Sequence, residues 1–242
     1  MRHTPRHAAV AAISCLAMLA GATAASALTV QIRNLELSGG PTLVINDNDA
    51  SDANPTIGLI DFSGAIPGPG ASSYVISGLH ANGRVGGQTY PDLYVSIHGL
   101  AWNGADPAAG LQIQIGDSGY LYQNNVVTQF AMSGLTTAGV HLAAESTIAY
   151  TNTDISFTTF DDQIVGGINI TPGGAFDETA SSGIAYRPGD PFAVQQVVRI
   201  SGVEAGVVRM SMGTSPIPIG PTLPLMLFGL AGLGALRGRA RA

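Results

Sequence analysis

The stretch Leu93–His98 has the sequence LYVSIH, in which every second residue is apolar. Residues 111–115, LQIQI, repeat the same alternation. A period of two places successive side chains on opposite faces of a strand, so that one face is buried and the other meets solvent. This pattern is typical of antiparallel sheets, and it predicts an all-β protein.

The same period continues through the body of the chain, from Leu28 to Gly213. At Arg33-Asn34 the alternation slips by one residue, which predicts a β-bulge inside the first strand. Turn-forming pairs such as Asn82-Gly83 separate the alternating runs, and no helical period of comparable length interrupts them. We therefore expect residues 28–214 to form a single antiparallel β-sandwich of jelly-roll type.

Residues 1–27 have the three parts of a secretory signal peptide. Arg2 and Arg6 supply a basic start, and Ala8–Leu19 forms a short apolar stretch. Ala25-Ser26-Ala27 fits the small-x-small cleavage pattern, which places the signal cleavage at Ala25 and Ala27. The N-terminus therefore predicts recognition by the Sec export machinery.

The composition limits the chemistry and the partners of the exported part. Cys15 is the only cysteine, so a chain cleaved after residue 27 has no thiol for a disulfide or for catalysis. Residues 28–215 hold all 16 acidic residues and five of the ten arginines, which gives a formal charge of −11. A body this acidic repels the phosphates of DNA and RNA, so nucleic acid is not an expected partner.

The C-terminal segment, residues 215–242, combines prolines, an apolar stretch and arginines. Residues 217–236 carry no charge, and a helix of this length rises about 30 Å, enough to cross the hydrocarbon core of a membrane. Arg237, Arg239 and Arg241 follow, and their positive charges favour the cytoplasmic side. The segment therefore predicts a transmembrane helix in the inner membrane, with the body of the chain outside the cytoplasm.

These C-terminal features together resemble the PEP-CTERM class of bacterial sorting signals, in particular the variant with the motif Val-Pro-Leu-Pro-Ala. The resemblance implies that the tail holds the precursor in the inner membrane until an exosortase-like membrane protease removes it. It also implies a role beside secreted extracellular polysaccharide. A plain single-span anchor is the alternative. The residues that carry the motif are Pro216, Ile217, Pro218, Ile219, Pro221 and Pro224.

The densest acidic cluster lies at residues 46–52, NDNDASD. Ca²⁺ takes about six to eight oxygen ligands, and closely spaced Asp and Asn side chains in a loop can supply them. The candidate ligands are Asp47, Asn48, Asp49 and Asp52. The cluster lacks the central Gly and terminal Glu of the helix-loop-helix calcium loop. A solvated turn, in which Asn and Asp bind their own backbone, is the interpretation that we favour.

The sequence contains no motif that establishes catalysis. Gly116-Asp117-Ser118-Gly119 resembles the nucleophile sequence of chymotrypsin-like proteases, but Tyr120 stands where a Gly should follow, and a hairpin turn explains the segment better. His80, His98 and His141 have no zinc-motif spacing. His98 is expected on the exposed face of its strand.

Two further sets of residues suit carbohydrate chemistry. Paired carboxylates hydrolyse glycosidic bonds, and Asp161-Asp162 and Asp177-Glu178 are adjacent pairs, although neighbouring residues of a strand point to opposite faces. Exposed aromatic rings offer a platform for sugars, but scattered tyrosines more often pack on sheets. The aromatic candidates are Tyr90, Tyr94, Trp102, Tyr120 and Tyr122.

The sequence thus favours a non-catalytic protein of the cell surface or extracellular matrix that needs no cofactor. A carbohydrate-binding module, with or without Ca²⁺, is the first alternative, and a secreted glycan hydrolase is the second. Titration with Ca²⁺ and a polysaccharide-degradation screen distinguish the three.

Overall fold

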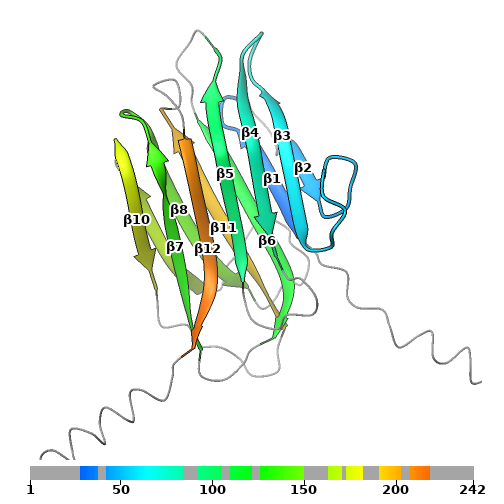
Figure 1. Ribbon diagram of the computed structural model, residues 1–242, viewed down its shortest axis with the longest axis vertical. Coiled ribbons are helices and arrows are strands. Elements are labelled where there is room, and N and C mark those ends of the chain that lie inside the picture. Colours follow the sequence, from blue (N-terminus) through cyan, green and yellow to red (C-terminus); the bar gives the residue numbers. More distant parts are fainter. Residues whose placement is uncertain are drawn as a thin grey trace, which may run out of the picture.

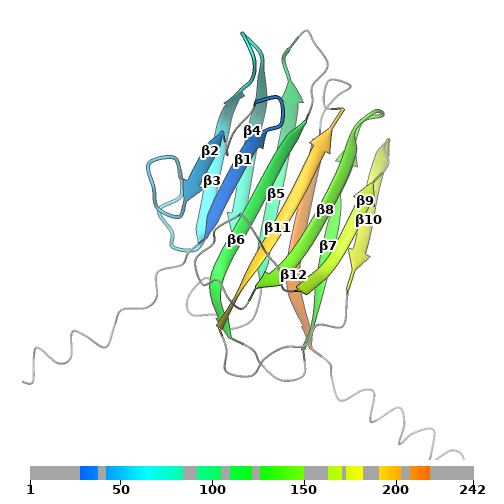
Figure 2. The same ribbon diagram turned by 180° about the vertical axis from the view of Figure 1, so that it is seen from behind.

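The computed structural model describes nine segments of the chain, which together form twelve β-strands and no helix. The strands pair into two six-stranded sheets, and every pairing is antiparallel (Figure 1 and Figure 2). The two-sheet antiparallel sandwich that the alternation predicts is therefore confirmed. The described residues are 28–37, 42–83, 92–104, 110–121, 126–149, 163–170, 173–181, 191–202 and 208–218.

Neighbouring strands come from distant parts of the sequence, since β12, the last strand, lies between β5 and β7. Sheet A, nearer the viewer in Figure 2, has the order β2-β1-β6-β11-β8-β9, and sheet B, nearer the viewer in Figure 1, has the order β10-β7-β12-β5-β4-β3. Sheet A comprises β1 (Thr29–Asn34), β2 (Leu43–Asn46), β6 (Leu111–Leu121), β8 (His141–Ala149), β9 (Gln163–Ile170) and β11 (Pro191–Ser201). Sheet B comprises β3 (Leu59–Pro67), β4 (Ser73–Asn82), β5 (Leu93–Trp102), β7 (Val126–Thr136), β10 (Gly174–Ala180) and β12 (Val208–Pro218).

The inward-facing side chains of both sheets form one apolar core. Its largest fully buried members are Tyr74, Tyr120, Phe130 and Phe192. Burying a large apolar side chain contributes on the order of 2–3 kcal/mol through the hydrophobic effect. Along the LYVSIH stretch of β5 the apolar residues are buried, and the residues between them are exposed or half-buried, as the alternation predicts.

A buried polar bridge joins the two sheets inside this core. Gln196 of β11 donates from Nε2 to the carbonyl oxygen of Leu93 and to Thr214 Oγ1, each at 2.8 Å. The hydroxyl oxygens of Thr214 and Ser146 lie 2.6 Å apart. Gln196 Oε1 is buried and has no hydrogen-bond partner within the described structure. Because buried polar groups hold particular partners, the bridge fixes β11 and β8 of sheet A against β12 and β5 of sheet B.

Two local expectations from the sequence are wrong. The slip at Arg33-Asn34 is not a bulge, because β1 ends at Asn34, whose Oδ1 accepts the N–H of Glu36 at 3.0 Å and starts a turn. Residues 116–119 are not a hairpin turn, because β6 continues through them. Within β6 a bulge lies at Gly119, where the pairing with β11 shifts and φ is +84°, a conformation that glycine adopts without strain.

The last strand runs to Pro218, beyond the domain boundary at residue 214 that the sequence indicates. Among the described residues, 215–218 pair only with β7, and the pairing of β12 with β5 stops at Thr214. A strand with one neighbour tolerates proline, because the missing N–H can face the unpaired side. The described residues contain no helix that is long and apolar enough to span a membrane.

Candidate functional site

A row of polar side chains crosses the outer face of sheet B, which is turned away from the core. Each strand contributes one member, and each member is the register partner of the next. All six side chains are exposed or half-buried, so their polar groups reach solvent. The hydroxyl oxygens of Ser133 and Ser211 lie 3.1 Å apart near the centre. From β10 to β3 the polar row is Asp177, Ser133, Ser211, Ser96, His80 and Asp61.

Two rings from β5 lie beside the polar row. Tyr94 is 38% exposed and covers Gly213 of β12, where an added Cβ would lie 3.4 Å from Tyr94 Cδ2. His98 is exposed, as predicted, and covers Gly78 of β4, with its Cδ2 3.3 Å from the place of an added Cβ. Because glycine occupies both neighbouring positions, each ring has room to extend over the next strand.

The face around these rings is hollowed. A central depression of about 310 Å³ is lined by residues of β5, β7 and β12, among them Tyr94, His98 and the exposed Arg209. A second depression shares His98 with it and extends to His80 on β4. A third shares Tyr94 and extends to Asp177 on β10. The three depressions therefore form one band across sheet B.

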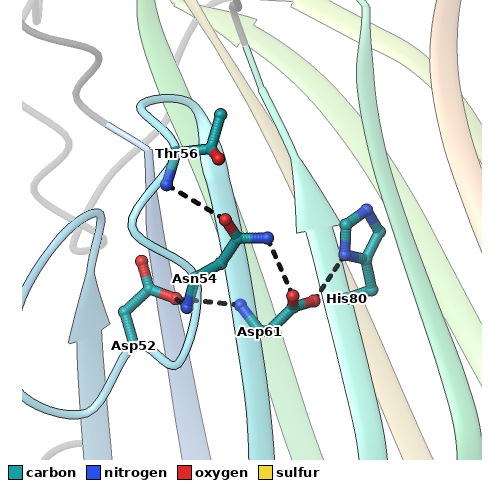
Figure 3. Close-up of polar contacts among 5 residues, drawn as sticks. All are labelled: Asp52, Asn54, Thr56, Asp61 and His80. Atoms are coloured by element: carbon teal, nitrogen blue, oxygen red, sulfur yellow. Dashed lines mark hydrogen bonds and ion pairs between the residues drawn. The ribbon is translucent and has the colours of Figure 1, made fainter.

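The polar row ends at β3 in a network that fixes Asp61 (Figure 3). Asp61 Oδ1 lies 2.5 Å from His80 Nδ1, and Asn54 Nδ2 donates to Asp61 Oδ2 at 2.8 Å. The N–H of Asp61 donates to Asp52 Oδ1 at 3.0 Å, and Asn54 Oδ1 accepts the N–H of Thr56 at 3.0 Å. The hydrogen bond from His80 holds the pKa of Asp61 below its usual value. Partial burial raises the pKa, and the hydrogen bond from Asn54 lowers it further. The carboxylate is therefore charged and orients the imidazole.

The Asp-rich loop that joins β2 to β3 directs its carboxylates toward backbone N–H groups. Asp49 accepts three of them at 2.7–3.2 Å, and Asp52 accepts three at 2.8–3.0 Å. Asp47 accepts the N–H of Gly58 at 2.8 Å and the side-chain amide of Asn48 at 2.8 Å. Asn48 itself adopts a left-handed conformation, with φ of 62°. These are the contacts of Asx turns, and they close the sandwich between the edge strands of the two sheets.

The electrostatics of this loop agree with that structural role. Partial burial raises the pKa of Asp47, against the lowering effect of the Gly58 N–H. Burial also opposes ionisation of Asp49, but its backbone N–H donors together hold the pKa of that carboxyl below its usual value. Within the described chain, no group of three or more His, Cys, Asp or Glu side chains is placed to hold a metal ion. The geometry of Asp47, Asn48, Asp49 and Asp52 thus supports the Asx-turn interpretation.

The protease-like segment lies inside β6 and not at a surface. Asp117 is fully buried, accepts the hydroxyl of Tyr120 at 2.9 Å and accepts the N–H of Ser118 at 2.8 Å. Ser118 is 7% exposed. The carboxylate therefore holds the bulged end of β6 in shape, and Ser118 is buried beside it.

Comparisons with known proteins identify no family for this chain. No family model and no curated protein matches the sequence. The fold is similar to that of the carbohydrate-binding module TmCBM61 in complex with β-1,4-galactotriose, with a TM-score of 0.31, 9% identity, and 69% of this chain and 91% of that chain covered. It is also similar to the enzymatically active domain of bacteriophage CBA120 tailspike protein 4, with a TM-score of 0.32, 12% identity, and 72% of this chain and 22% of that chain covered. The likeness concerns the fold, so function has to be argued from the residues of this chain.

The remaining candidate residues are scattered. Tyr120 is fully buried, and Trp102 is half-buried against Tyr74, with ring centroids 4.6 Å apart. Pro216, Ile217 and Pro218 of the sorting motif lie in β12, and Glu178 is exposed beside Asp177 on β10. The other predicted residues lie outside the described ones: Ala25, Ala27, Tyr90, Tyr122, Asp161, Asp162, Ile219, Pro221, Pro224, Arg237, Arg239 and Arg241.

Sequence reasoning missed Ser96, Ser133, Ser211 and Arg209 as members of a site. Each occupies the outward position of an alternating strand, and this signal is present in the sequence. Alternation does not say which strands become neighbours, so it does not bring these four side chains to one surface.

Proposed function

We propose that the chain is a non-catalytic exported β-sandwich that binds polysaccharide on the outer face of sheet B. The observation that carries this proposal is the unbroken polar row across all six strands, beside the exposed ring of Tyr94. Serine hydroxyls donate and accept hydrogen bonds, as sugar hydroxyls do, and a tyrosine ring packs against the apolar face of a sugar. A band open along its length suits a polymer, whereas small ligands are usually enclosed.

The two ends of the chain support the proposed location. The signal-peptide pattern of residues 1–27 favours Sec-dependent export. The uncharged residues 217–236, followed by arginines, favour an anchored precursor in the inner membrane. We infer that an exosortase-like protease then processes the tail, as the PEP-CTERM resemblance implies. The product belongs to the cell surface or the extracellular matrix, where polysaccharide is the natural ligand.

Affinity electrophoresis tests the binding proposal, with full-length chain in nonionic detergent and gels that contain different polysaccharides. We expect at least one polymer to retard the chain. Tyr94→Ala should weaken that interaction about tenfold, because ring packing contributes roughly 0.5–1.5 kcal/mol beyond the area it buries. Val44→Ala is the matched control, since Val44 has the same exposed fraction of 38% but lies on sheet A. Unchanged migration in every gel, or an equal effect of both variants, would contradict the proposal.

The non-catalytic part of the proposal has its own test. We expect no new reducing ends after long incubation of the chain with any polysaccharide that it binds. Product that appears with the wild type and disappears in a single-carboxylate variant such as Asp61→Asn or Asp177→Asn would instead assign glycan hydrolysis to that carboxylate.

A further inference from the structure

Arg209 is exposed on sheet B, and its guanidinium has no hydrogen bond or ion pair with any residue that the structure describes. It lines the central depression together with Tyr94, Ser211 and His98. No Asp or Glu occurs among the described residues that line this depression, although residues 28–215 carry a formal charge of −11. The guanidinium is therefore a local cation on an acidic molecule.

Arg199, on the outer face of sheet A, has different surroundings from Arg209. Its Nε donates to Gln112 Oε1 at 3.3 Å, and Glu145 lines the same depression of sheet A. Arg199 therefore has a side-chain partner and shares its depression with a carboxylate of the chain. The depression around Arg209 contains hydroxyl groups and rings instead, and among the described residues none of its five N–H donors has a partner.

We propose that the polysaccharide bound by sheet B carries carboxylate groups, as uronic acid units do, and that Arg209 binds one of them. The inference rests on the proposed function and adds the chemical class of the ligand. A guanidinium is planar and permanently charged, and it pairs with a carboxylate through two parallel hydrogen bonds. The hydroxyl of Ser211, two residues away on the same face of β12, is placed for the neighbouring sugar hydroxyls.

The positions on β12 also set the length of the ligand. Gly213, which lies beneath Tyr94, and Arg209 are four residues apart, a distance of about 13 Å along a strand. One sugar ring on Tyr94 does not reach that far with its own carboxylate. The site therefore takes an oligosaccharide segment and not a single sugar, with Ser211 between the two contacts.

The acidic body opposes an anionic polymer at long range but not at contact distance. At about 0.15 M salt the Debye length is about 8 Å, so distant acids are screened while a direct Arg–carboxylate pair is screened much less. Binding should therefore hold or strengthen when salt rises from about 0.02 M to about 0.15 M. A diffuse basic patch would show the opposite trend.

The test uses full-length chain and three acidic polysaccharides, polygalacturonate, alginate and hyaluronate, each beside its neutral carboxyl-esterified form. We expect at least one acid form to bind about tenfold more tightly than its ester, as one charge-assisted pair permits. Arg209→Gln should lower the affinity for the acid form to that for the ester, and Arg209→Lys should keep part of the difference. Arg199→Gln is the matched control and should bind as the wild type does.

Equal affinity for acid and ester forms of all three polymers, or unchanged binding by Arg209→Gln, would overturn the uronate assignment. If the esters or neutral polymers still bind through Tyr94, the proposed function stands without it. If no polymer of either kind binds, both fall. Tighter binding of dextran sulfate than of every uronate polymer would also overturn the assignment, because it would indicate a general affinity for anions. Circular dichroism of each variant verifies that the sandwich is folded.

Discussion

The ring of Tyr94 covers Gly213, its register partner on the neighbouring strand β12. Gly213 has no side chain to compete for that space, so the position of the exposed ring depends on the glycine beneath it. On the other side of β5, the ring of His98 covers Gly78, although the register partner of Gly78 is Gly99. Glycine on one strand thus determines how a ring on the next strand is exposed on the outer face of sheet B.

We therefore expect Gly213→Val to displace Tyr94 and to weaken polysaccharide binding about tenfold, the loss expected for removal of one ring contact. Gly213→Ala should have little effect, because its methyl group would meet Tyr94 Cδ2 at an ordinary contact distance of 3.4 Å. Valine is favourable in strands, so the melting temperature of Gly213→Val should stay close to that of the wild type. Gly167→Val on sheet A is the control, since an added Cβ there meets nothing closer than 3.8 Å. Wild-type affinity in Gly213→Val would show that the placement of the ring is unimportant.

The Asp61–His80 pair predicts a pH-dependent contribution to stability. The pKa of Asp61 is lowered in the folded state, so its contribution is fully present above the unfolded value of about 3.9 and is lost as pH falls through the folded value. The side chains are 42% and 36% exposed, and solvent screening limits the contribution to about 0.5 kcal/mol. Asp61→Asn should therefore melt about 1–2 °C below the wild type at pH 7, and the difference should shrink below about pH 4. A double-mutant cycle with His80→Gln checks the assignment, and additive effects of the two changes would refute it.

The buried bridge in the core predicts that a single substitution in it lowers stability more than the combined replacement of its three polar side chains. Thr214→Val removes the partner of Ser146 and one acceptor of Gln196, which should cost about 1–3 kcal/mol of unfolding free energy. Thermal unfolding should report a melting temperature lower by about 2–4 °C per kcal/mol. The triple variant Ser146→Ala, Gln196→Met and Thr214→Val should be more stable than Thr214→Val alone, because it leaves no hydroxyl or amide of the bridge unpaired. If Thr214→Val has the same melting temperature as the wild type, the bridge does not contribute to the stability of the sandwich.

The Asp-rich loop should stabilise the sandwich without calcium. Asp49 accepts three backbone N–H groups, so Asp49→Ala should lower the unfolding free energy by about 1 kcal/mol, the usual scale for exposed bonds of this kind. Millimolar Ca²⁺ or EDTA should leave the melting temperature of the wild type unchanged. A calcium-dependent rise that Asp49→Ala abolishes would reverse this interpretation and assign Asp47, Asn48, Asp49 and Asp52 as ligands.

The sequence was sufficient for the fold class but not for the proposed binding face. Alternation is a local property, so it correctly assigned Tyr94, Ser96 and His98 to the outer side of their strand. The polar row also needs β12 beside both β5 and β7, although β5 and β12 are more than a hundred residues apart. Such pairings are set by how whole sheets pack, which no local pattern records. The continuation of β12 was missed for a related reason, because prolines predict the end of a strand unless one of its sides is known to be unpaired.

The extent of β12 predicts where a sorting protease can cut. Residues 215–218 pair with β7, from Ser215 opposite Gln129 to Pro218 opposite Val126, whereas a protease needs an extended segment that is free of such pairing. We therefore expect the mature C-terminus, measured by mass spectrometry of the exported protein, to lie beyond Pro218. Gln129→Pro, which removes one N–H from β7 near this end, should loosen the pairing and move the cut toward Ser215. Ala138→Pro is the control, because Ala138 lies in the turn after β7. A wild-type terminus at or before Ser215 would mean that the end of β12 leaves β7 before processing, and an uncut tail would indicate a plain membrane anchor.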